Sequence, residues 1–303
     1  MSRLYRLLGI VIAVFCAVYG GQIVRQIMAT ELTYQSFWHY LVRVFLILGM
    51  GIVGVLILSN FSVYNPSEVI GTPPTPEVGF KLSNQLKRIT DVGVAIVLLF
   101  VLSPILILIP VLIFIIEGYP VFYISKRYIS LSNCVSVLKY RTMVRDATSP
   151  KYRLRERFMR SGYLDIPLSC EVYTPLGRIL ERTQLVEILQ LFNVLLHGMS
   201  LIGNRPLPLD NIKLLQNFKG WEHRFDSPAG LTGITQVVGK HNQSPEQRLE
   251  LECMYSKLYK SETANIFRCD IWIAYYTVRM LLTGKTLSIE GAKELIRSVS
   301  GEE

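Results

Sequence analysis

The sequence predicts a membrane protein with a hydrophobic amino-terminal part and a larger, basic polar part. Half of the 303 residues are hydrophobic, only 18% are charged, and the mean hydropathy is +0.33. These values indicate that part of the chain lies in a bilayer. Three long hydrophobic segments lie within the first 116 residues, whereas residues 117–303 hold 25 basic and 19 acidic residues. The composition excludes a secreted miniprotein, a collagen and a coiled coil.

The first two hydrophobic segments predict a transmembrane helical hairpin over residues 1–60. Leu7–Val24 contains 18 uncharged residues, about the minimum for a spanning helix, and it lacks a convincing signal-peptide cleavage site. Phe37–Ser59 is apolar except for two residues near one end. Because basic residues precede and follow the hairpin, we expect the rest of the chain on the cytoplasmic side. Residues 61–80 are rich in proline and predict a linker.

The third segment, Val92–Ile116, contains 25 uncharged residues. Ser103-Pro104 lies at its midpoint, where proline removes a backbone donor and clashes with the carbonyl of Phe100, so we expect a kink. Pro110 is expected to add a second interruption. Each arm is then about 18 Å of helix, which suits a re-entrant or interfacial segment better than a span. Residues 81–116 are therefore predicted to be a re-entrant membrane helix, with a third spanning helix as the alternative.

The net charge of residues 117–303 is +6. This surplus fits a surface beside anionic lipid, or a site for anionic substrates. No basic run with interleaved aromatic residues is present, so nucleic acid is not an expected partner. The five cysteines lie far apart, without CxxC or Cys/His spacing. Neither a disulfide scaffold nor a zinc site is therefore expected.

Short sequence blocks between about residues 81 and 285 carry the strongest functional signal. Each block alone is weak evidence, but their order is specific. They are Lys87-Arg88 with Asp91, Ser103-Pro104, Pro120-Val121-Phe122 with Arg127, Lys139-Tyr140-Arg141-Thr142-Met143, Pro175-Leu176-Gly177-Arg178, Gln190 to Leu195, Met199 to Pro206, and Gly230 to Gln236. In this order the blocks resemble the bacterial sugar transferase family, the polyprenyl-phosphate hexose-1-phosphate transferases.

The resemblance implies a monotopic α/β catalytic domain over residues 117–303, attached by a re-entrant helix that is broken at Ser103 and Pro104. It also implies transfer of a sugar 1-phosphate from a UDP-sugar to polyprenyl (undecaprenyl) phosphate, with release of UMP and with Mg²⁺ as cofactor. This reaction is the first membrane step of exopolysaccharide, capsule or O-antigen type glycan assembly. The implied location is the bacterial inner membrane, with a cytoplasmic catalytic domain and with downstream glycosyltransferases as further partners.

Cations that suit phosphate groups are the first candidates for the site. Lys139 and Arg141 follow the membrane segment closely, and arginine can bind phosphate oxygens in a bidentate manner. Arg205 lies in the stiff turn Gly203-Asn204-Arg205-Pro206. Ordinary surface or turn residues are the alternative. The predicted substrate-binding residues are Lys139, Arg141, Arg178, Arg182, Arg205 and Gln236.

A central helix is predicted from Thr183 to His197, with an apolar core face and a separate polar face. A lone Glu187 in such apolar surroundings is unfavourable unless it is paired or binds metal. We therefore predict that Glu187 is the magnesium ligand and the catalytic residue, with a salt bridge to Arg178 or Arg182 as the alternative. The core face is formed by Leu185, Leu189, Phe192 and Leu196, and the polar face by Thr183, Glu187, Gln190, Asn193 and His197.

The sequence departs from the family at a position that matters for chemistry. The family motif is Ser-Leu-Asp-Glu-Leu-Pro-Gln, in which the Asp is the nucleophile, whereas residues 184–190 read Gln-Leu-Val-Glu-Ile-Leu-Gln. Val186 cannot form a phosphoryl intermediate. Either Glu187 is the nucleophile, or the lipid phosphate attacks directly in a site that supplies positioning and charge, or catalysis has been lost. In the last case the protein is a catalytically silent membrane paralogue that binds a UDP-sugar or a glycosyltransferase partner.

The carboxy-terminal part offers weaker signals. The glycines of Gly230–Lys240 permit close approach to a ligand, and a β-turn is the alternative. Asn204 stands where the family commonly has proline, and Glu252 where aspartate is usual. Asp270–Leu282 has the pattern of an amphipathic interfacial helix, with a buried core helix as the alternative.

Overall fold

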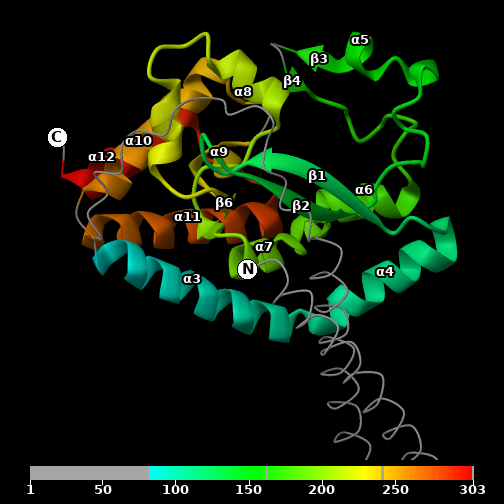
Figure 1. The fold of residues 1–303 in the computed structure, drawn as a ribbon, viewed down its shortest axis with the longest axis horizontal. Coiled ribbons are helices and arrows are strands. Elements are labelled where there is room, and N and C mark those ends of the chain that lie inside the picture. Colours follow the sequence, from blue (N-terminus) through cyan, green and yellow to red (C-terminus); the bar gives the residue numbers. More distant parts are fainter. Residues whose placement is uncertain (1–81, 161–162, 240–241, 262, 302–303) are drawn as a thin grey trace, which may run out of the picture. The chain divides into compact units, whose positions relative to one another are not determined.

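The computed structural model describes residues 82–160, 163–239, 242–261 and 263–301 (Figure 1). This part of the chain combines helices with three pairs of short strands, so its mixed α/β character is confirmed. The predicted hairpin of residues 1–60 and the linker of residues 61–80 lie outside the described residues. The chain divides into two compact units: residues 99–118 belong to one, and residues 82–98 and 119–301 belong to the other.

The third hydrophobic segment forms two helices, α3 (Leu82–Val101) and α4 (Ser103–Glu117). The two helices are bent by 59° at the break between them. Within the described ranges, no single helix is long and apolar enough to cross a membrane, whereas this bent pair reaches that length and composition together. The predicted break is therefore confirmed.

The break follows from Ser103 and Pro104. Pro104 lies in the first turn of α4, where a helix needs no N–H donor. The carbonyl of Phe100 would normally accept a hydrogen bond from the N–H of residue 104, but proline has no N–H. It accepts one from Ser103 Oγ at 2.7 Å instead. The predicted second interruption is wrong, because Pro110 lies inside a continuous α4. A single proline removes one backbone bond, and the bonds on either side of it keep the helix intact.

Strands β1 (Phe122–Tyr128) and β2 (Cys134–Tyr140) form an antiparallel hairpin. The register places Tyr123 opposite Lys139. Directly paired residues of antiparallel strands project from the same face, and every second residue along a strand shares that face. Arg127 and Lys139 therefore project from one face of this hairpin.

Strands β5 (Ser200–Ile202) and β6 (Gly230–Thr232) form a parallel pair that brings two glycine-containing segments together. A Cβ atom on Gly230 would lie 2.1 Å from the nitrogen of Gly203, and one on Gly233 would lie 2.0 Å from the Gly203 oxygen. The close approach expected of these glycines is therefore an approach of backbone to backbone, which explains them without a ligand.

The predicted continuous helix from Thr183 to His197 is wrong. Helix α6 (Pro175–Arg182) ends before a short 3₁₀ turn, η2 (Leu185–Glu187), and α7 (Gln190–Leu196) follows. Gln184 has a φ of 57°, in the left-handed region, and its Nε2 donates to the Glu181 carbonyl at 2.7 Å. This turn ends α6, since a left-handed residue cannot continue a right-handed helix.

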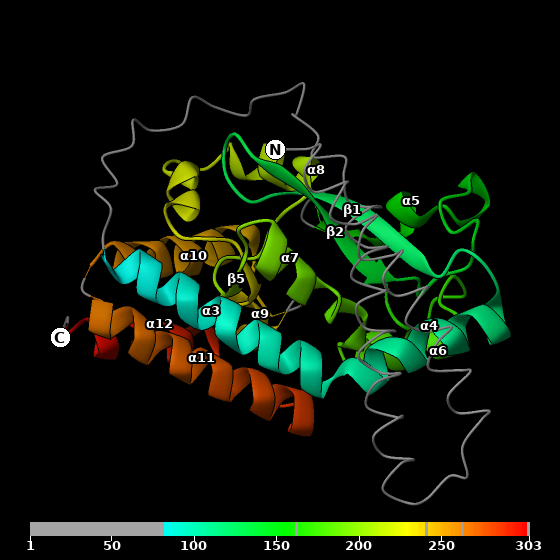
Figure 2. The same ribbon diagram turned by 60° about the horizontal axis from the view of Figure 1, so that its bottom comes forward.

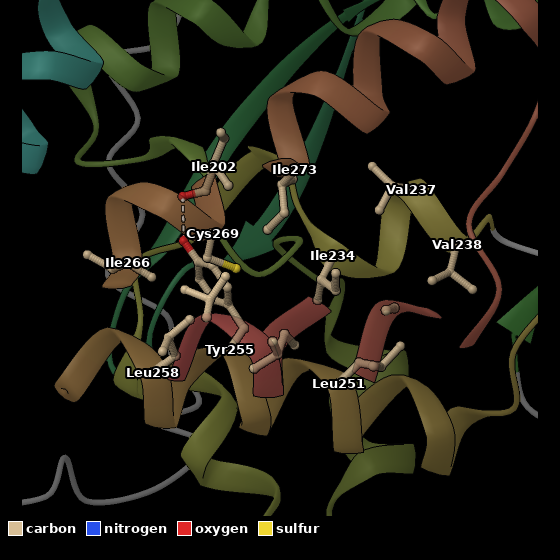
Figure 3. Packing of buried hydrophobic residues seen from close by; sticks show 13 residues of the cluster. Ile202, Ile234, Val237, Val238, Leu251, Tyr255, Leu258, Ile266, Cys269 and Ile273 are labelled. Carbon is tan, nitrogen blue, oxygen red and sulfur yellow. Dashed lines mark hydrogen bonds between the residues drawn. The ribbon is translucent and has the colours of Figure 1, made fainter. Parts of the chain in front are cut away.

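The remaining elements support these segments. A buried hydrophobic cluster joins β5 to four carboxy-terminal helices, and Figure 3 shows its side chains, including Tyr255, Leu251 and Ile273. The helices and strands not yet described are η1 (Pro150–Tyr152), α5 (Leu154–Phe158), β3 (Met159–Arg160), β4 (Tyr163–Leu164), α8 (Leu209–Leu215), η3 (Trp221–Asp226), α9 (Ile234–Val238), α10 (Pro245–Lys260), α11 (Thr263–Thr283) and α12 (Ile289–Ser300).

Helices α3 and α11 lie side by side (Figure 2). Nζ of Lys87 in α3 lies 2.5 Å from the Asp270 carboxylate in α11. The same carboxylate accepts from the Tyr255 hydroxyl at 2.8 Å, and Asp91 accepts from Ser200 Oγ at 2.5 Å. All five residues are buried. This polar network fixes the first part of α3 against β5, α10 and α11.

The glycine contact between the two strands gives a stability prediction. Gly230→Ala places a methyl group against the Gly203 backbone, so we expect it to lower the free energy of unfolding by at least about 2 kcal/mol. The control is Gly93→Ala in α3, where no atom lies within 4 Å of the added Cβ and a small gain of stability is expected. Thermal unfolding of both variants tests this, and equal midpoints would contradict it.

Candidate functional site

Glu187 is buried between two cations. Lys139 Nζ donates to Oε1 of Glu187 at 2.7 Å, and Arg205 Nη1 donates to Oε2 at 3.0 Å. Arg205 Nη2 also donates to Oε1, so the arginine and the carboxylate form a bidentate pair. The structure thus brings three predicted site residues together from β2, η2 and the turn after β5.

The expected salt bridge of Glu187 is present, but its predicted partners are wrong. Lys139 and Arg205 pair with Glu187, rather than Arg178 or Arg182. Both of those arginines lie on α6, which the left-handed turn at Gln184 separates from Glu187. Arg178 and Arg182 precede Glu187 by nine and five residues, whereas its actual partners lie 48 and 18 residues away along the chain.

The cations decide the charge state of Glu187. Burial alone would raise the pKa of Glu187, but Arg205 and Lys139 outweigh burial and hold this pKa well below its usual range. Burial lowers the pKa of Lys139, and Glu187 opposes that effect. Glu187 is therefore ionised at neutral pH, so it has no proton to give as a general acid.

A second buried ion pair holds the turn that carries Arg205. Arg224 Nη2 donates to the Arg205 carbonyl at 2.8 Å, and Arg224 Nε donates to Glu252 at 2.7 Å. Asn204 Nδ2 lies 2.8 Å from the Arg224 carbonyl and 3.0 Å from the Glu252 carbonyl. Arg224 and Glu252 are 2% and 0% exposed, so this network fixes the backbone of the turn. The role of Arg224 could not be predicted from the sequence, because its partners lie 19 and 28 residues away along the chain.

The predicted polar face of the central helix is only partly present. Asn193 and Gln190 are buried, and Asn193 Nδ2 donates to the Ser136 carbonyl of β2 at 2.8 Å. Thr183 is exposed and its hydroxyl donates to the Ile179 carbonyl. The break at η2 separates Thr183 from α7, whereas Asn193 Nδ2 still lies 3.4 Å from His197 Nδ1. Leu196, predicted for the core, is 43% exposed.

The other predicted site residues have separate surroundings. Arg141 is buried, with Nη1 3.5 Å from the Met143 carbonyl. Arg182 is exposed at the end of α6. Arg178 Nε and Gln236 Nε2 are buried without a hydrogen-bond partner among the described residues. Within the residues that the structure describes, Arg178, Arg182 and Gln236 form no hydrogen bond or ion pair with Glu187. Their substrate-binding role stays a prediction.

Arg127 is a further cation of this site. It projects from the hairpin face that carries Lys139, and its Nε donates to Ser125 Oγ at 2.9 Å. Burial and, after it, the nearby Arg205 lower the pKa of Arg127 while Glu187 opposes both, and together these effects leave the pKa at about 10. Arg127 belongs to one of the family-like sequence blocks, but no role was predicted for it. The strand register, which places it on the same face as Lys139, was the missing signal.

Comparison with known proteins identifies the family. A sequence model described as "Bacterial sugar transferase" matches residues 82–284. The chain belongs to this family. It is 29% identical over 181 residues to "Exopolysaccharide production protein ExoY" of Sinorhizobium fredii, with 56% of this chain and 76% of that protein covered. The family resemblance predicted from the sequence blocks is therefore confirmed.

Two further relatives extend this comparison. The chain is 28% identical over 216 residues to "UDP-glucose:undecaprenyl-phosphate glucose-1-phosphate transferase" of Escherichia coli, with 70% of this chain and 44% of that protein covered. It is 29% identical over 200 residues to "Uncharacterized sugar transferase EpsL" of Bacillus subtilis, with 66% of this chain and 89% of that protein covered. The chain thus spans less than half of the Escherichia coli protein and most of the other two.

The described residues do not fit a resident magnesium ion at Glu187 in this arrangement. Both of its carboxylate oxygens accept hydrogen bonds from cations, which repel a metal ion. Across the described ranges, no group of three or more His, Cys, Asp or Glu side chains could hold a metal ion. Magnesium binding by Glu187 stays a prediction.

The ion cluster predicts how stability depends on pH. Glu187→Gln leaves two partly buried cations without their buried carboxylate, so we expect a loss of about 3–5 kcal/mol at pH 7.5. Because the folded pKa of Glu187 lies below the usual value of 4.5, its contribution is complete above that value and is lost as the pH falls through the folded pKa. The stability difference between wild type and Glu187→Gln should therefore be constant above about pH 5 and shrink at lower pH.

Thermal unfolding between pH 3 and pH 8 measures this difference. The matched control is Glu250→Gln, which removes an exposed carboxylate paired with Lys293 and should change stability by less than about 1 kcal/mol. A difference that grows as the pH falls below 4.5, or a Glu187→Gln variant as stable as the control, would contradict the prediction.

Proposed function

We propose that the protein transfers a sugar 1-phosphate from a UDP-sugar to undecaprenyl phosphate and releases UMP. The observation that carries this proposal is the cluster of Lys139, Glu187 and Arg205 in a bacterial sugar transferase. The name of the Escherichia coli relative contains UDP-glucose and undecaprenyl phosphate, which supports this donor and acceptor. Two cations held in fixed positions suit a reaction in which every reacting group is a phosphate.

The proposed reaction joins two phosphates directly. An oxygen of the lipid phosphate forms a bond to the phosphorus that carries the sugar, and the bond from this phosphorus to the UMP oxygen breaks. UMP leaves with the bonding electron pair. Lys139 and Arg205 bind the phosphate oxygens and stabilise the charge of the transition state. Glu187 holds these two cations in position, and both of its oxygens are already engaged, which favours direct attack by the lipid over attack by Glu187.

The exposed surface supports a place at the bilayer. The outer face of α11 exposes Ile271, Trp272, Tyr275, Val278 and Leu282, and the neighbouring α3 exposes further apolar side chains. Large contiguous apolar surfaces are typical of membrane or protein contacts, and Trp and Tyr favour the membrane interface. Helix α11 also buries Ile266, Cys269 and Ile273, so it has one core face and one free apolar face. We place this free face against the cytoplasmic leaflet of the bacterial inner membrane.

The relatives suggest the pathway. The name of the Sinorhizobium relative refers to exopolysaccharide production. A transferase that makes a lipid-linked sugar supplies the acceptor for later glycosyltransferases. We therefore propose that the protein acts at the first membrane step of surface glycan assembly, upstream of such enzymes.

A silent paralogue is the second candidate function, and Val186 favours it. Val186 stands where the family has its nucleophilic aspartate, and it is 2% exposed. A buried valine offers no group that could accept the phosphosugar. In this case the same cluster binds a UDP-sugar without turnover, or the protein serves a glycosyltransferase partner.

Release of UMP decides between the two functions. The full chain in nanodiscs with Mg²⁺, undecaprenyl phosphate and a panel of UDP-sugars should release UMP only with the lipid and with a particular sugar. Glu187→Ala should reduce this release at least about a hundredfold, because Lys139 and Arg205 lose the group that positions them. The control Glu250→Ala, at an exposed surface pair, should keep wild-type activity.

Two results would overturn parts of the proposal. Wild-type activity in Glu187→Ala would remove Glu187 from the mechanism. No UMP release from any donor, together with intact UDP-sugar binding and a gain of activity in Val186→Asp, would establish the silent paralogue.

Trp272 reports on the bilayer contact. A variant with Trp38→Phe and Trp221→Phe keeps Trp272 as its single tryptophan, and its fluorescence should be quenched by lipids brominated near the headgroup. The control variant keeps only Trp221, which packs against the cluster of Leu207, Ile212 and Leu215 and should be quenched much less. Equal quenching of the two variants would contradict a bilayer contact of α11.

A further inference from the structure

The cation cluster around Glu187 holds more positive charge than its carboxylate balances. Arg127, Lys139 and Arg205 all interact with Glu187 and with one another. Three cations and one carboxylate give this group of four residues a net charge of +2. Lys139 and Arg205 have side chains that are only 17% and 18% exposed, so water screens their repulsion weakly. Such a surplus favours the binding of an anion.

Arg127 has the geometry of a ligand-binding side chain. Its position two residues from Ser125 on the same strand face allows the Nε to Ser125 Oγ bond of 2.9 Å. This bond uses one of the five N–H donors of the guanidinium and orients the plane. Tyr123, the residue opposite Lys139, precedes Ser125 on the same face. The bond to Ser125 therefore holds the guanidinium on the face from which Lys139 extends.

A structural ion pair does not explain Arg127. Arg224 is buried against Glu252, and Arg205 is paired with Glu187, so each of these arginines has a carboxylate of its own. No carboxylate lies within salt-bridge distance of Arg127 among the residues that the structure describes. Its terminal Nη atoms make no hydrogen bond to that part of the chain either. These donors are available for a bound anion.

We propose that Arg127 is a phosphate-binding residue, which together with Lys139 and Arg205 forms a site for a diphosphate on this face of the β1–β2 hairpin. This inference rests on the proposed function, because a UDP-sugar brings a diphosphate to the site. Two adjacent phosphate groups supply the negative charge that Glu187 alone does not provide. The guanidinium of Arg127 binds one phosphate, and Lys139 and Arg205 bind the other.

Inorganic pyrophosphate is the probe for this site. The full chain in phosphatidylcholine nanodiscs is titrated with pyrophosphate by calorimetry, and Arg127→Gln should weaken binding at least about tenfold, because it removes a charged hydrogen bond. The control is Lys126→Gln, which removes the same charge one residue away, from an exposed position on the opposite face of the strand. The control should stay within about twofold of wild type.

A second readout separates binding from a structural role. Without pyrophosphate, Arg127→Gln should unfold at the same temperature as wild type or higher, because the substitution removes repulsion from Arg205 and Lys139. A structural arginine would lower this temperature when replaced. Pyrophosphate should raise the unfolding temperature of wild type and of Lys126→Gln, and it should raise that of Arg127→Gln less at the same concentration.

A parallel titration with undecaprenyl phosphate in the nanodiscs identifies the source of the phosphate. Loss of pyrophosphate binding in Arg127→Gln supports the diphosphate site. The site is overturned if Arg127→Gln weakens binding of the lipid phosphate alone, or if its pyrophosphate affinity equals that of wild type. It is also overturned if Lys126→Gln loses as much pyrophosphate affinity as Arg127→Gln, or if wild type does not bind pyrophosphate. Absence of UMP release, with the Arg127 effect intact, would contradict the proposed transferase and leave the diphosphate site standing.

Discussion

The buried carboxylate of Glu187 is the group on which the arrangement of the site depends. It joins η2 to β2 and to the turn after β5. Its partner in β2, Lys139, lies 48 residues away along the chain, and its partner in the turn, Arg205, lies 18 residues away. Removing one member of a buried ion pair leaves an uncompensated charge, which is far less favourable than the intact pair. The three segments are therefore held in one arrangement by electrostatics as well as by packing. A transferase benefits from such rigidity, because phosphate groups react only when they are held in line.

A second layer of polar contacts keeps this arrangement in place. Arg224 and Glu252 hold the backbone at Arg205, and Asn193 holds α7 against β2. Two departures from the family lie in this layer and touch each other, since Asn204 Nδ2 lies 3.0 Å from the Glu252 carbonyl. The stiffness that proline commonly supplies at position 204 comes here from hydrogen bonds of the asparagine. The turn that carries Arg205 is therefore kept in place despite these two departures.

Local chemistry was predictable from the sequence, whereas long-range pairing was not. The break at Ser103-Pro104 follows from the missing N–H of proline, and a lone Glu187 in apolar surroundings was expected to have a partner. The identity of that partner depends on the left-handed turn at Gln184, which hydrophobic periodicity does not reveal. Hydrophobic periodicity therefore predicted one helix through residues 183–189, and nearness along the chain suggested the wrong arginines. Arg127 was missed for a similar reason, since strand register is a tertiary property.

The loss of the aspartate at position 186 affects binding and chemistry differently. Val186 and Leu189 are 2% and 1% exposed, so both substitutions place apolar side chains in the interior, where they favour folding. The cations of the site do not depend on position 186, because Lys139 and Arg205 are positioned by Glu187 and by the turn after β5. Close like charges are unfavourable without an anion, so the proposed phosphate site does not require a covalent intermediate. In the proposed function, the missing nucleophile therefore bears on how a phosphosugar would be transferred, and not on the charges that would bind its phosphates.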